Sequence, residues 1–353
     1  MKKFNFKNIL QRKKPYLIAE IGVNHENSIR KAEKMILQAK LGGADAVKFQ
    51  TYKADLIASK NSPYYWDLKK VSETSQYKLF KKFDKFGEDE YKKLKKICDK
   101  HKITFTSTPF DIHSVDFLDK LVPFFKIASA DFTNLPLIDK VCSKKKPIII
   151  STGACDIKEI IFLDKYLKKN FPKIEVIFLH CVLSYPTSFS DANLNFIKIL
   201  KKRFPHRTIG YSDHTMPDQS MMVLTKSYEY GAEIIEKHFT VDKLKGKKNN
   251  DHFHSMDFND VKKFRNNIEL IKRINGEIKN RIILKCEKKS RKNARRSIFT
   301  LGKIKKNQKI TYKNIIAKRP GDGISPIFVK KIINKIAKKD LNDDHKIKYS
   351  DFR

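Results

Sequence analysis

The stretch PYLIAEIGVNHENSIRKAEKMILQAKLGGADAVKFQTY, residues 15–52, holds a strand, a helix and a second strand in succession. The runs 15–22 and 45–52 are short, apolar and rich in β-branched and aromatic residues, which is typical of buried strands. Between them, apolar residues follow the helical period of 3.6 at Ile29, Ala32, Met35, Ile36 and Ala39. Ser28 can cap the start of this helix, and the glycine pair 42–43 can end it. A unit of this kind predicts a parallel sheet with crossover helices.

The same unit recurs along the chain. Short apolar runs of strand-like composition occupy residues 15–22, 45–52, 103–110, 123–129, 146–153, 175–181, 207–213 and 232–239. Amphipathic helical stretches separate these runs. Eight strand–helix units predict an α/β fold, a (β/α)8 or TIM barrel. The alternative is an open doubly wound sheet, but no glycine-rich dinucleotide fingerprint follows the first run.

The chain length leaves room for a second domain. A barrel of this class needs ~250 residues, and the chain has 353. A charged stretch, CEKKSRKNARR (286–296), reads as a linker, and after it short alternating runs and turn residues dominate. We therefore predict a catalytic barrel at 1–286 and a small β-rich domain at 287–353.

The composition narrows the class of protein. The net charge of +37 comes from 76 basic and 39 acidic residues, and the lysines are spread along the whole chain. Without an RNP-like, zinc-finger or helix-turn-helix signature, this charge does not indicate a nucleic-acid partner. Apolar runs stay well short of the ~20 residues of a membrane helix, and the N-terminus is too polar for a signal peptide. Five cysteines without CxxC spacing favour reduced thiols, so we expect a cytoplasmic protein without a membrane partner.

Polar residues gather where the predicted strands end, which is where barrel enzymes carry their chemistry. They are Glu20, Asn24, His25, Lys48, Gln50, Thr106, Ser107, Thr108, Lys126, Ser129, Asp131, Ser151, Thr152, His180, Tyr185, Ser212, Asp213, His214, Glu236 and His238. One lysine or histidine at a strand end is usually structural or solvent-exposed. Polar residues at all eight strand ends predict an active site instead.

These residue types suit a phosphate and a metal. Two lysines and several hydroxyls can neutralise phosphate oxygens and donate hydrogen bonds to them. His214 and His238 each follow a polar residue at a spacing of two, and two histidines near carboxylates suit a divalent metal with open positions. His252 and His254 could add ligands, but a loop pair is more often exposed to solvent or in contact with a sugar. The residues alone therefore indicate metal-assisted chemistry on a small phosphorylated substrate, without naming the reaction.

The sequence motifs at the strand ends indicate a resemblance to a known family. In order along roughly residues 15–330 stand IAEIGVNHENS, AVKFQTY, TSTPF, KIASAD, ISTGA, LHC, SYPT, IGYSDHT, EIIEKHF, ARRSIF and KRPGDGISP. In these motifs the chain resembles the sialic acid synthases, enzymes that use phosphoenolpyruvate to synthesise nonulosonic acids such as N-acetylneuraminate, legionaminate and pseudaminate. The C-terminal part resembles the antifreeze-like (SAF, β-clip) domain of those enzymes.

The resemblance implies a reaction and a cofactor. Phosphoenolpyruvate would condense with the open-chain aldehyde of an N-acylated amino sugar of the N-acetylmannosamine type. C3 of the enol ether attacks the aldehyde carbon, water adds to C2, and phosphate leaves by C–O cleavage. The resemblance also implies a divalent metal, Mn²⁺ or Mg²⁺, held by His214 and His238.

The resemblance further implies roles for single residues. Phosphoenolpyruvate would contact Lys48, Thr108, Lys126, Ser129, Ser151 and Ser212. Glu20 and Glu236 would act near the reacting carbons, one of them as the general acid or base, beside His214 and His238. Tyr185 and Asp251 would contact the sugar. Arg319 would reach the sugar's acyl group from the partner subunit, which implies a domain-swapped homodimer.

Some positions depart from the family pattern. Leu183 stands where the family often has Asn or Ser, and Asp131 where Glu is commoner. The segments 61–75 and 244–256, both expected to face the sugar, differ in sequence from the family pattern. The resemblance therefore defines the class of reaction better than the identity of the sugar. The alternatives are another phosphoenolpyruvate or pyruvate condensation on the same fold and a carbohydrate- or ice-binding protein without activity. The cluster of lysines and hydroxyls fits phosphate better than a Schiff base.

Overall fold

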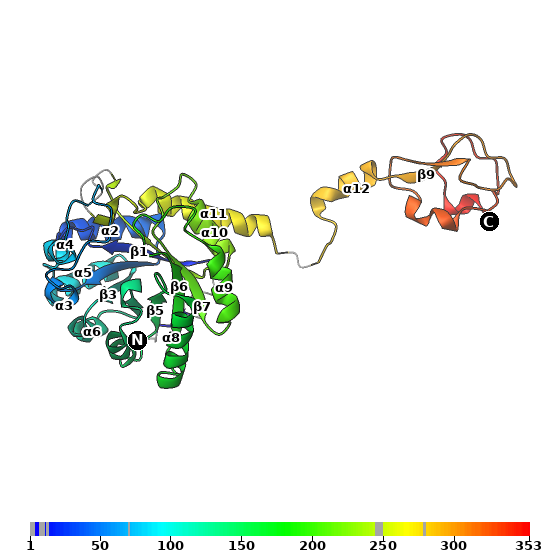
Figure 1. Ribbon diagram of the computed structural model, residues 1–353. Helices are drawn as coiled ribbons and strands as arrows, with labels where there is room; N and C mark the ends of the chain where they lie inside the picture. Colours follow the sequence, from blue (N-terminus) through cyan, green and yellow to red (C-terminus); the bar gives the residue numbers. More distant parts are fainter. Residues whose placement is uncertain (1–3, 7–10, 12–13, 70, 244–249, 278–279) are drawn as a thin grey trace. The chain divides into compact units, whose positions relative to one another are not determined.

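The computed structural model describes residues 4–6, 11, 14–69, 71–243, 250–277 and 280–353. The chain forms two compact units, Met1–Asn275 and Gly276–Arg353 (Figure 1). The boundary predicted at 286/287 lies inside the second unit and remains a proposal for where the small domain itself begins.

The first unit is built around parallel strands in the order β3-β2-β1-β8-β7-β6-β5-β4. Their bounds are β1 Tyr16–Gly22, β2 Ala46–Thr51, β3 Thr104–Pro109, β4 Phe125–Ile127, β5 Ile148–Ser151, β6 Val176–Cys181, β7 Thr208–Asp213 and β8 Ile234–His238. Strand β1 pairs with both β2 and β8, as a barrel requires. Between β3 and β4, the hydroxyl of Thr106 donates to the carbonyl of Phe124 at 3.0 Å. Every predicted strand run contains one of these strands, so the (β/α)8 prediction is confirmed.

Helices connect the strands and cover the outside of the barrel (Figure 1). They are α2 Ile29–Gly42, α3 Ala54–Ile57, α4 Gln76–Phe83, α5 Glu88–Lys100, α6 Ile112–Asp119, α7 Leu135–Cys142, α8 Ile157–Asn170, α9 Asn195–Arg203, α10 Met222–Glu229 and α11 Phe258–Asn275. The first helix begins and ends as predicted. The Ser28 side chain accepts from the N–H of Lys31, and Gly43 takes the left-handed conformation at φ 106° that glycine adopts without strain.

Two apolar layers hold the barrel together. The larger layer lies between strands and helices and includes Ala32, Met35 and Ile36 of α2. The smaller layer fills the inside of the barrel near the start of the strands and consists of Phe6, Tyr16, Ile18, Ala46, Phe124, Ile149, Ile177, Leu179 and Ile234. The rings of Phe6 and Phe124 lie 4.9 Å apart there. This packing closes the N-terminal end of the barrel, so the opposite end is the one that can receive a ligand.

The second unit contains helix α12 (Lys288–Ala294) and a small antiparallel sheet of β9 (Ser297–Thr300) and β10 (Ile315–Lys318). Its own core consists of Ile298, Ile310, Ile315, Ile324, Ile332, Ile347 and Phe352. Within the predicted linker 286–296, residues 288–294 form helix α12, which has no buried residue, and the linker role stays a prediction. Among the residues that the structure describes, no helix combines the length and apolar character that crossing a bilayer requires.

Candidate active site

A cavity of about 550 Å³ opens at the C-terminal ends of the strands. Its lining includes every site residue predicted within the barrel, namely Glu20, Lys48, Thr108, Lys126, Ser129, Ser151, Tyr185, Ser212, His214, Glu236, His238 and Asp251. Leu183 and Asp131, the two departures from the family pattern, also line it. Arg319 lies in the second unit with an exposed side chain, and its role stays a prediction. The structure thus brings all the predicted barrel residues to one cavity.

Other polar residues near the strand ends pack away from this cavity. His180 is hydrogen-bonded through Nε2 to the carbonyl of Ala192 at 2.9 Å, and its ring stacks on Tyr211. His25 stacks on Phe86 with 4.4 Å between ring centroids. Because successive strand residues face opposite sides, only alternate polar residues reach the barrel interior. The strand-end pattern therefore overstated the site, and these two histidines are structural.

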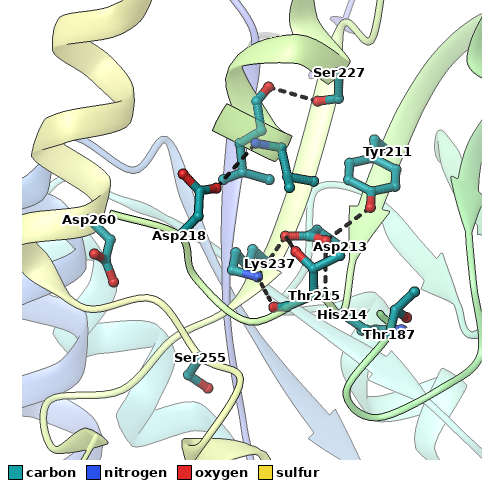
Figure 2. Close-up of polar contacts among 12 residues, drawn as sticks. Thr187, Tyr211, Asp213, His214, Thr215, Asp218, Ser227, Lys237, Ser255 and Asp260 are labelled. Carbon is teal, nitrogen blue, oxygen red and sulfur yellow. Dashed lines mark hydrogen bonds and ion pairs between the residues drawn. The ribbon is translucent and has the colours of Figure 1, made fainter. Parts of the chain in front are cut away.

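Asp213 and Lys237 sit between inward-facing residues on β7 and β8, so their side chains face the outer layer (Figure 2). Nζ of Lys237 lies 2.6 Å from Oδ2 of Asp213, and both side chains are 1% exposed. The hydroxyl of Tyr211 and the backbone N–H of Thr215 both donate to Oδ1 of Asp213 at 2.9 Å. Lys237 also donates to the carbonyl of Thr215 at 2.7 Å. This satisfied ion pair joins the two strands that carry His214 and His238.

Replacing Lys237 by methionine is expected to lower the free energy of unfolding by about 3–5 kcal/mol, because Asp213 would remain buried without its cation. Urea unfolding followed by circular dichroism measures this change. The double variant Lys237→Met/Asp213→Leu should recover part of the loss, since it leaves no unpaired charge. A loss below about 1 kcal/mol in the single variant would show that the pair does not stabilise these strands.

Lys48 forms one half of an ionic cluster on the cavity floor. Its Nζ lies 2.7 Å from Oε2 of Glu20 and 3.8 Å from Oε1 of Glu236, and it donates to Oγ1 of Thr108 at 3.0 Å. Gln50 donates to the other oxygen of Glu20 at 3.2 Å. The strand register sets this arrangement, since Glu20 on β1 is level with Lys48 on β2. The lysine is therefore held in place before any ligand arrives.

Lys126 forms the other half of the cluster. It donates to Oγ of Ser151 at 2.8 Å, and its Nζ lies 3.5 Å from Oε1 of Glu236. The hydroxyl of Ser212 donates to the same oxygen of Glu236 at 3.3 Å. The other oxygen of Glu236 is buried and has no hydrogen-bond partner among the described residues. A buried carboxylate oxygen of this kind can accept a proton or a hydrogen bond from a substrate.

The two carboxyl groups of the cluster have opposite pKa shifts. Burial raises the pKa of Glu20 to about 7, against the lowering effect of Lys48. Burial also acts on Glu236, but Lys126 and Lys48 outweigh it and lower the pKa of that carboxyl. Neighbouring acids whose pKa values are pushed apart are a mark of acid–base chemistry. Glu20 can thus carry a proton near neutral pH, whereas Glu236 stays ionised.

Ser129 lies on the wall of the cavity and is held by the strand that follows. Its Oγ accepts from the N–H of Gly153 at 3.0 Å. A Cβ at position 153 would lie 2.7 Å from this oxygen, so only glycine permits the contact. The hydroxyl is therefore fixed beside the lysine cluster by the backbone.

His214, His238 and Asp251 line one side of the cavity, and the ring of His254 lies 4.7 Å from that of His238. His214 and His238 have ring centroids 5.6 Å apart, and Nδ1 of His214 lies 2.8 Å from the carbonyl of Val182. That carbonyl can only accept, so Nδ1 carries the proton and Nε2 is left to bind a ligand. Donor atoms of His238, Asp251 and His254 all lie within 4.8 Å of one another. The structure thus places His254, one of the two possible additional ligands, beside His238 and Asp251.

These residues fit a divalent metal. Both ring nitrogens of His254 are buried without a hydrogen-bond partner among the described residues, and Nδ1 of His238 lies 3.3 Å from Oδ2 of Asp251. Burial lowers the pKa of both imidazoles well below the usual value, and the neighbouring histidines add to this effect. Neutral imidazoles are the form that binds metals. Of the two alternatives expected for His252 and His254, exposure to solvent was wrong, because both side chains are buried, and contact with a sugar stays a prediction.

An aromatic rim borders the cavity above Tyr185. Tyr65 and Trp66 come from the segment after β2, Phe253 comes from the segment after β8, and all three line the cavity. The rings of Tyr65 and Tyr185 lie 6.5 Å apart. Both atypical segments, 61–75 and 244–256, thus contribute to the lining, although residues 244–249 fall outside the described part of the chain. Aromatic faces of this kind suit the apolar face of a sugar or an acyl methyl group.

Comparison with known proteins agrees with the family resemblance seen in the sequence. The model of the NeuB family matches residues 35–280, and that of the SAF domain matches residues 295–353. The N,N'-diacetyllegionaminic acid synthase of Legionella pneumophila is 36% identical over 332 residues, covering 90% of this chain and 89% of its own. The N-acetylneuraminate-9-phosphate synthase of Drosophila melanogaster is 32% identical over 321 residues, 84% of each chain.

A solved structure extends the comparison to the fold. The crystal structure of the N-acetylneuraminic acid synthetase of Leptospira borgpetersenii, in complex with citrate, superposes with a TM-score of 0.68 at 32% identity. The match covers 79% of this chain and 90% of that one. The fold of most of this chain is therefore shared with that synthetase.

Proposed function

This chain belongs to the NeuB family of synthases, and from that membership we propose that it condenses phosphoenolpyruvate with an N-acylated amino sugar. The products would be a nonulosonic acid and inorganic phosphate. The observation that carries the proposal is the buried cluster in which Lys48 and Lys126 are held beside hydroxyl groups and two carboxyls of opposite pKa shift.

Phosphoenolpyruvate is a small polyanion, and the cluster suits it. Lys48 and Lys126 would neutralise its phosphate and carboxylate, and the hydroxyls of Thr108, Ser151 and Ser129 would donate to its oxygens. Because both lysines are buried, their attraction for an anion is screened less than in water. Protonation of Glu20 would leave the cluster with net positive charge and favour binding further.

The same cluster can manage the protons of the condensation. C3 of phosphoenolpyruvate forms a bond to the aldehyde carbon, and the aldehyde oxygen takes up a proton. We assign that proton to Glu20, whose pKa lies near 7. Positive charge then develops at C2 until water adds, and the ionised Glu236 would stabilise it. The added water gives up one proton, which the Glu20 carboxylate can take back. Cleavage of the C2–O bond then releases phosphate with the proton of the C2 hydroxyl and leaves a ketone at C2.

His214 and His238 would hold a divalent cation, Mn²⁺ or Mg²⁺, on the sugar side of the cavity. When bound, such a cation supplies Lewis acidity that polarises the aldehyde oxygen. The rings of Tyr185 and His214 are tilted by 39° with centroids 4.2 Å apart, and Tyr185 would orient the sugar together with Asp251. The free thiols, of which Cys98, Cys142 and Cys181 are buried, fit a reducing compartment, and we propose that the enzyme acts in the cytoplasm.

Replacing Glu20 by glutamine is expected to lower kcat/KM about a hundredfold, because glutamine cannot donate the proton. In the wild type, kcat/KM should fall as the pH rises through about 7, since the acidic form of Glu20 is lost there. Rates between pH 5.5 and 9 measure both effects. A Glu20→Gln variant that keeps the same decline above pH 7 would assign the titration to another group.

Arg319 is proposed to reach the acyl group of the sugar in the partner's site of a domain-swapped homodimer. Replacing it by alanine should raise KM for the sugar about 10–100-fold and leave KM for phosphoenolpyruvate unchanged, since a hydrogen bond to a charged group is worth about 1.5–3 kcal/mol. Lys318→Ala, which removes the neighbouring cation paired with Asp344, is the matched control. An unchanged KM, or a monomer on gel filtration, would contradict the swapped arrangement.

Phosphate release tests the proposed function. The purified full-length protein is given phosphoenolpyruvate, Mn²⁺ and one acceptor at a time: N-acetylmannosamine, its 6-phosphate, or the diacetamido-trideoxy hexoses that lead to legionaminate and pseudaminate. We expect release with one acceptor, abolished by a chelator. Release that needs no acceptor, or none with any acceptor despite bound phosphoenolpyruvate, would count against this reaction.

A further inference from the structure

We propose that His254 is a ligand of the metal, so that the cation is held by a nitrogen-rich set that joins His254 and Asp251 to His238. The role of the metal in catalysis rests on the proposed function, but binding of the metal by His254 can be tested without any substrate. Donor atoms from these three residues already lie within 4.8 Å of one another. Two ligands bound to one ion at about 2.1 Å can be at most about twice that distance apart, so a small adjustment would close the site.

The state of the His254 side chain is the main argument. It is 0% exposed, and neither ring nitrogen has a hydrogen-bond partner among the described residues. Leaving one buried polar group unpaired costs about 1–3 kcal/mol, so a histidine with two such atoms needs a missing partner. The ring lies 4.7 Å from that of His238 and 6.2 Å from that of His214. The missing partner would therefore sit where the other histidines meet.

His252, two residues earlier, shows what a structural histidine looks like in the same turn. Its Nδ1 lies 2.7 Å from the hydroxyl of Thr240, and its Nε2 lies 3.4 Å from Oε1 of Glu26. Both nitrogens thus face polar atoms of the protein. Burial of the turn alone consequently does not explain why His254 is unpaired.

The donor set has a consequence for the choice of metal. Imidazole nitrogens favour Co²⁺ and Zn²⁺ over Mn²⁺ and Mg²⁺, whereas sites of oxygen ligands suit the latter two. His238 and His254 supply two imidazoles and Asp251 one carboxylate, and the ring of His214 lies 5.6 Å from that of His238. This site should therefore bind Co²⁺ more tightly than Mn²⁺, and His254 should contribute to that difference.

Metal titration without substrates tests the inference. Metal-free wild type, His254→Leu and His252→Gln are titrated with Co²⁺ and with Mn²⁺ by calorimetry, with thermal unfolding as the check on folding. Leucine is chosen because it fills a similar volume without a donor atom. We expect His254→Leu to weaken Co²⁺ binding at least about tenfold and to alter the visible spectrum of the bound ion. His252→Gln should bind Co²⁺ like the wild type.

Two outcomes would overturn the inference. One is an unchanged Co²⁺ affinity and spectrum in His254→Leu. The other is a raised KM for the sugar with unchanged metal affinity, which would make His254 a sugar contact. If the variant does not fold, anomalous diffraction from wild-type crystals with Co²⁺ decides, since a ligand nitrogen must lie within about 2.0–2.2 Å of the ion. Failure of phosphate release would leave these results untouched and would count only against the proposed reaction.

Discussion

Replacing His238 by alanine is expected to lower kcat at least about a thousandfold while the protein remains folded. A metal acting as a Lewis acid supplies several kcal/mol of transition-state stabilisation, and each 1.36 kcal/mol is a factor of ten in rate. His238 stands at the centre of the proposed site, near both His214 and His254. Folding should survive because Nδ1 of His238 contacts Asp251 at 3.3 Å, and that carboxylate has a side chain 26% exposed that water can solvate instead.

The rate is measured at saturating phosphoenolpyruvate and sugar over a range of Mn²⁺ concentrations, with circular dichroism to verify the fold. His113→Ala, which removes an exposed histidine of α6, is the matched control and should keep its rate. A kcat near the wild-type value in His238→Ala would remove the metal assignment for this residue. Partial recovery at high Mn²⁺ would instead support it, because a weakened site fills at higher concentration.

The strands were predictable because each buried strand leaves a local mark in the sequence. Runs such as 207–213 and 232–239 are apolar, short and followed by polar residues, and the structure has β7 and β8 within them. The spacing of two that placed Ser212 and His214 on one face follows from strand geometry and needs no tertiary information. The candidate site could be assembled for the same reason, since parallel strands bring their carboxyl ends to one edge.

The same alternation could have found the pair beneath the histidines. Asp213 and Lys237 lie between inward-facing residues, and the sheet register makes them direct neighbours. That register depends on which strands pair, which the barrel prediction already implied. The outward ion pair was therefore accessible to sequence reasoning, although the strand-end residues named above include Asp213 without Lys237.

Other features depend on packing that the sequence does not reveal. His254 follows the short turn 250–252, and it is buried against the rings of His238 and Tyr185, which lie far from it in the sequence. Helix α12 carries no buried residue, so its segment lacks the apolar periodicity that marks a helix. The pKa split between Glu20 and Glu236 arises from distances to Lys48 and Lys126 that only the folded cluster defines.

Replacing Lys126 by methionine is expected to lower kcat/KM for phosphoenolpyruvate about a thousandfold. A preorganised charge in a buried site is worth about 2.7–4 kcal/mol to a transition state, and methionine keeps the shape of the chain without the charge. Lys100→Met, where the side chain is 72% exposed, is the matched control for a lost lysine charge. A Lys126→Met variant within tenfold of the wild type would contradict a direct role in binding the substrate.

The same variant also tests the electrostatic account of the cluster through its pH dependence. In the wild type, burial raises the pKa of Glu236, but the nearby cations, Lys126 first among them, lower it by more, so the net shift is downward. The ionised form of Glu236 therefore stabilises the fold at pH values above its unfolded pKa of 4.5. Without Lys126, burial should raise that pKa above the unfolded value, and the native state would then bind more protons than the unfolded state. The loss of unfolding free energy, variant against wild type, should therefore grow as the pH rises from about 4.5 to 7. Urea unfolding across that range measures it. A loss that is constant with pH would mean that Lys48 alone keeps Glu236 ionised. It would contradict the shared role that the distances imply, since Nζ of Lys126 and Nζ of Lys48 lie 3.5 and 3.8 Å from Oε1 of Glu236.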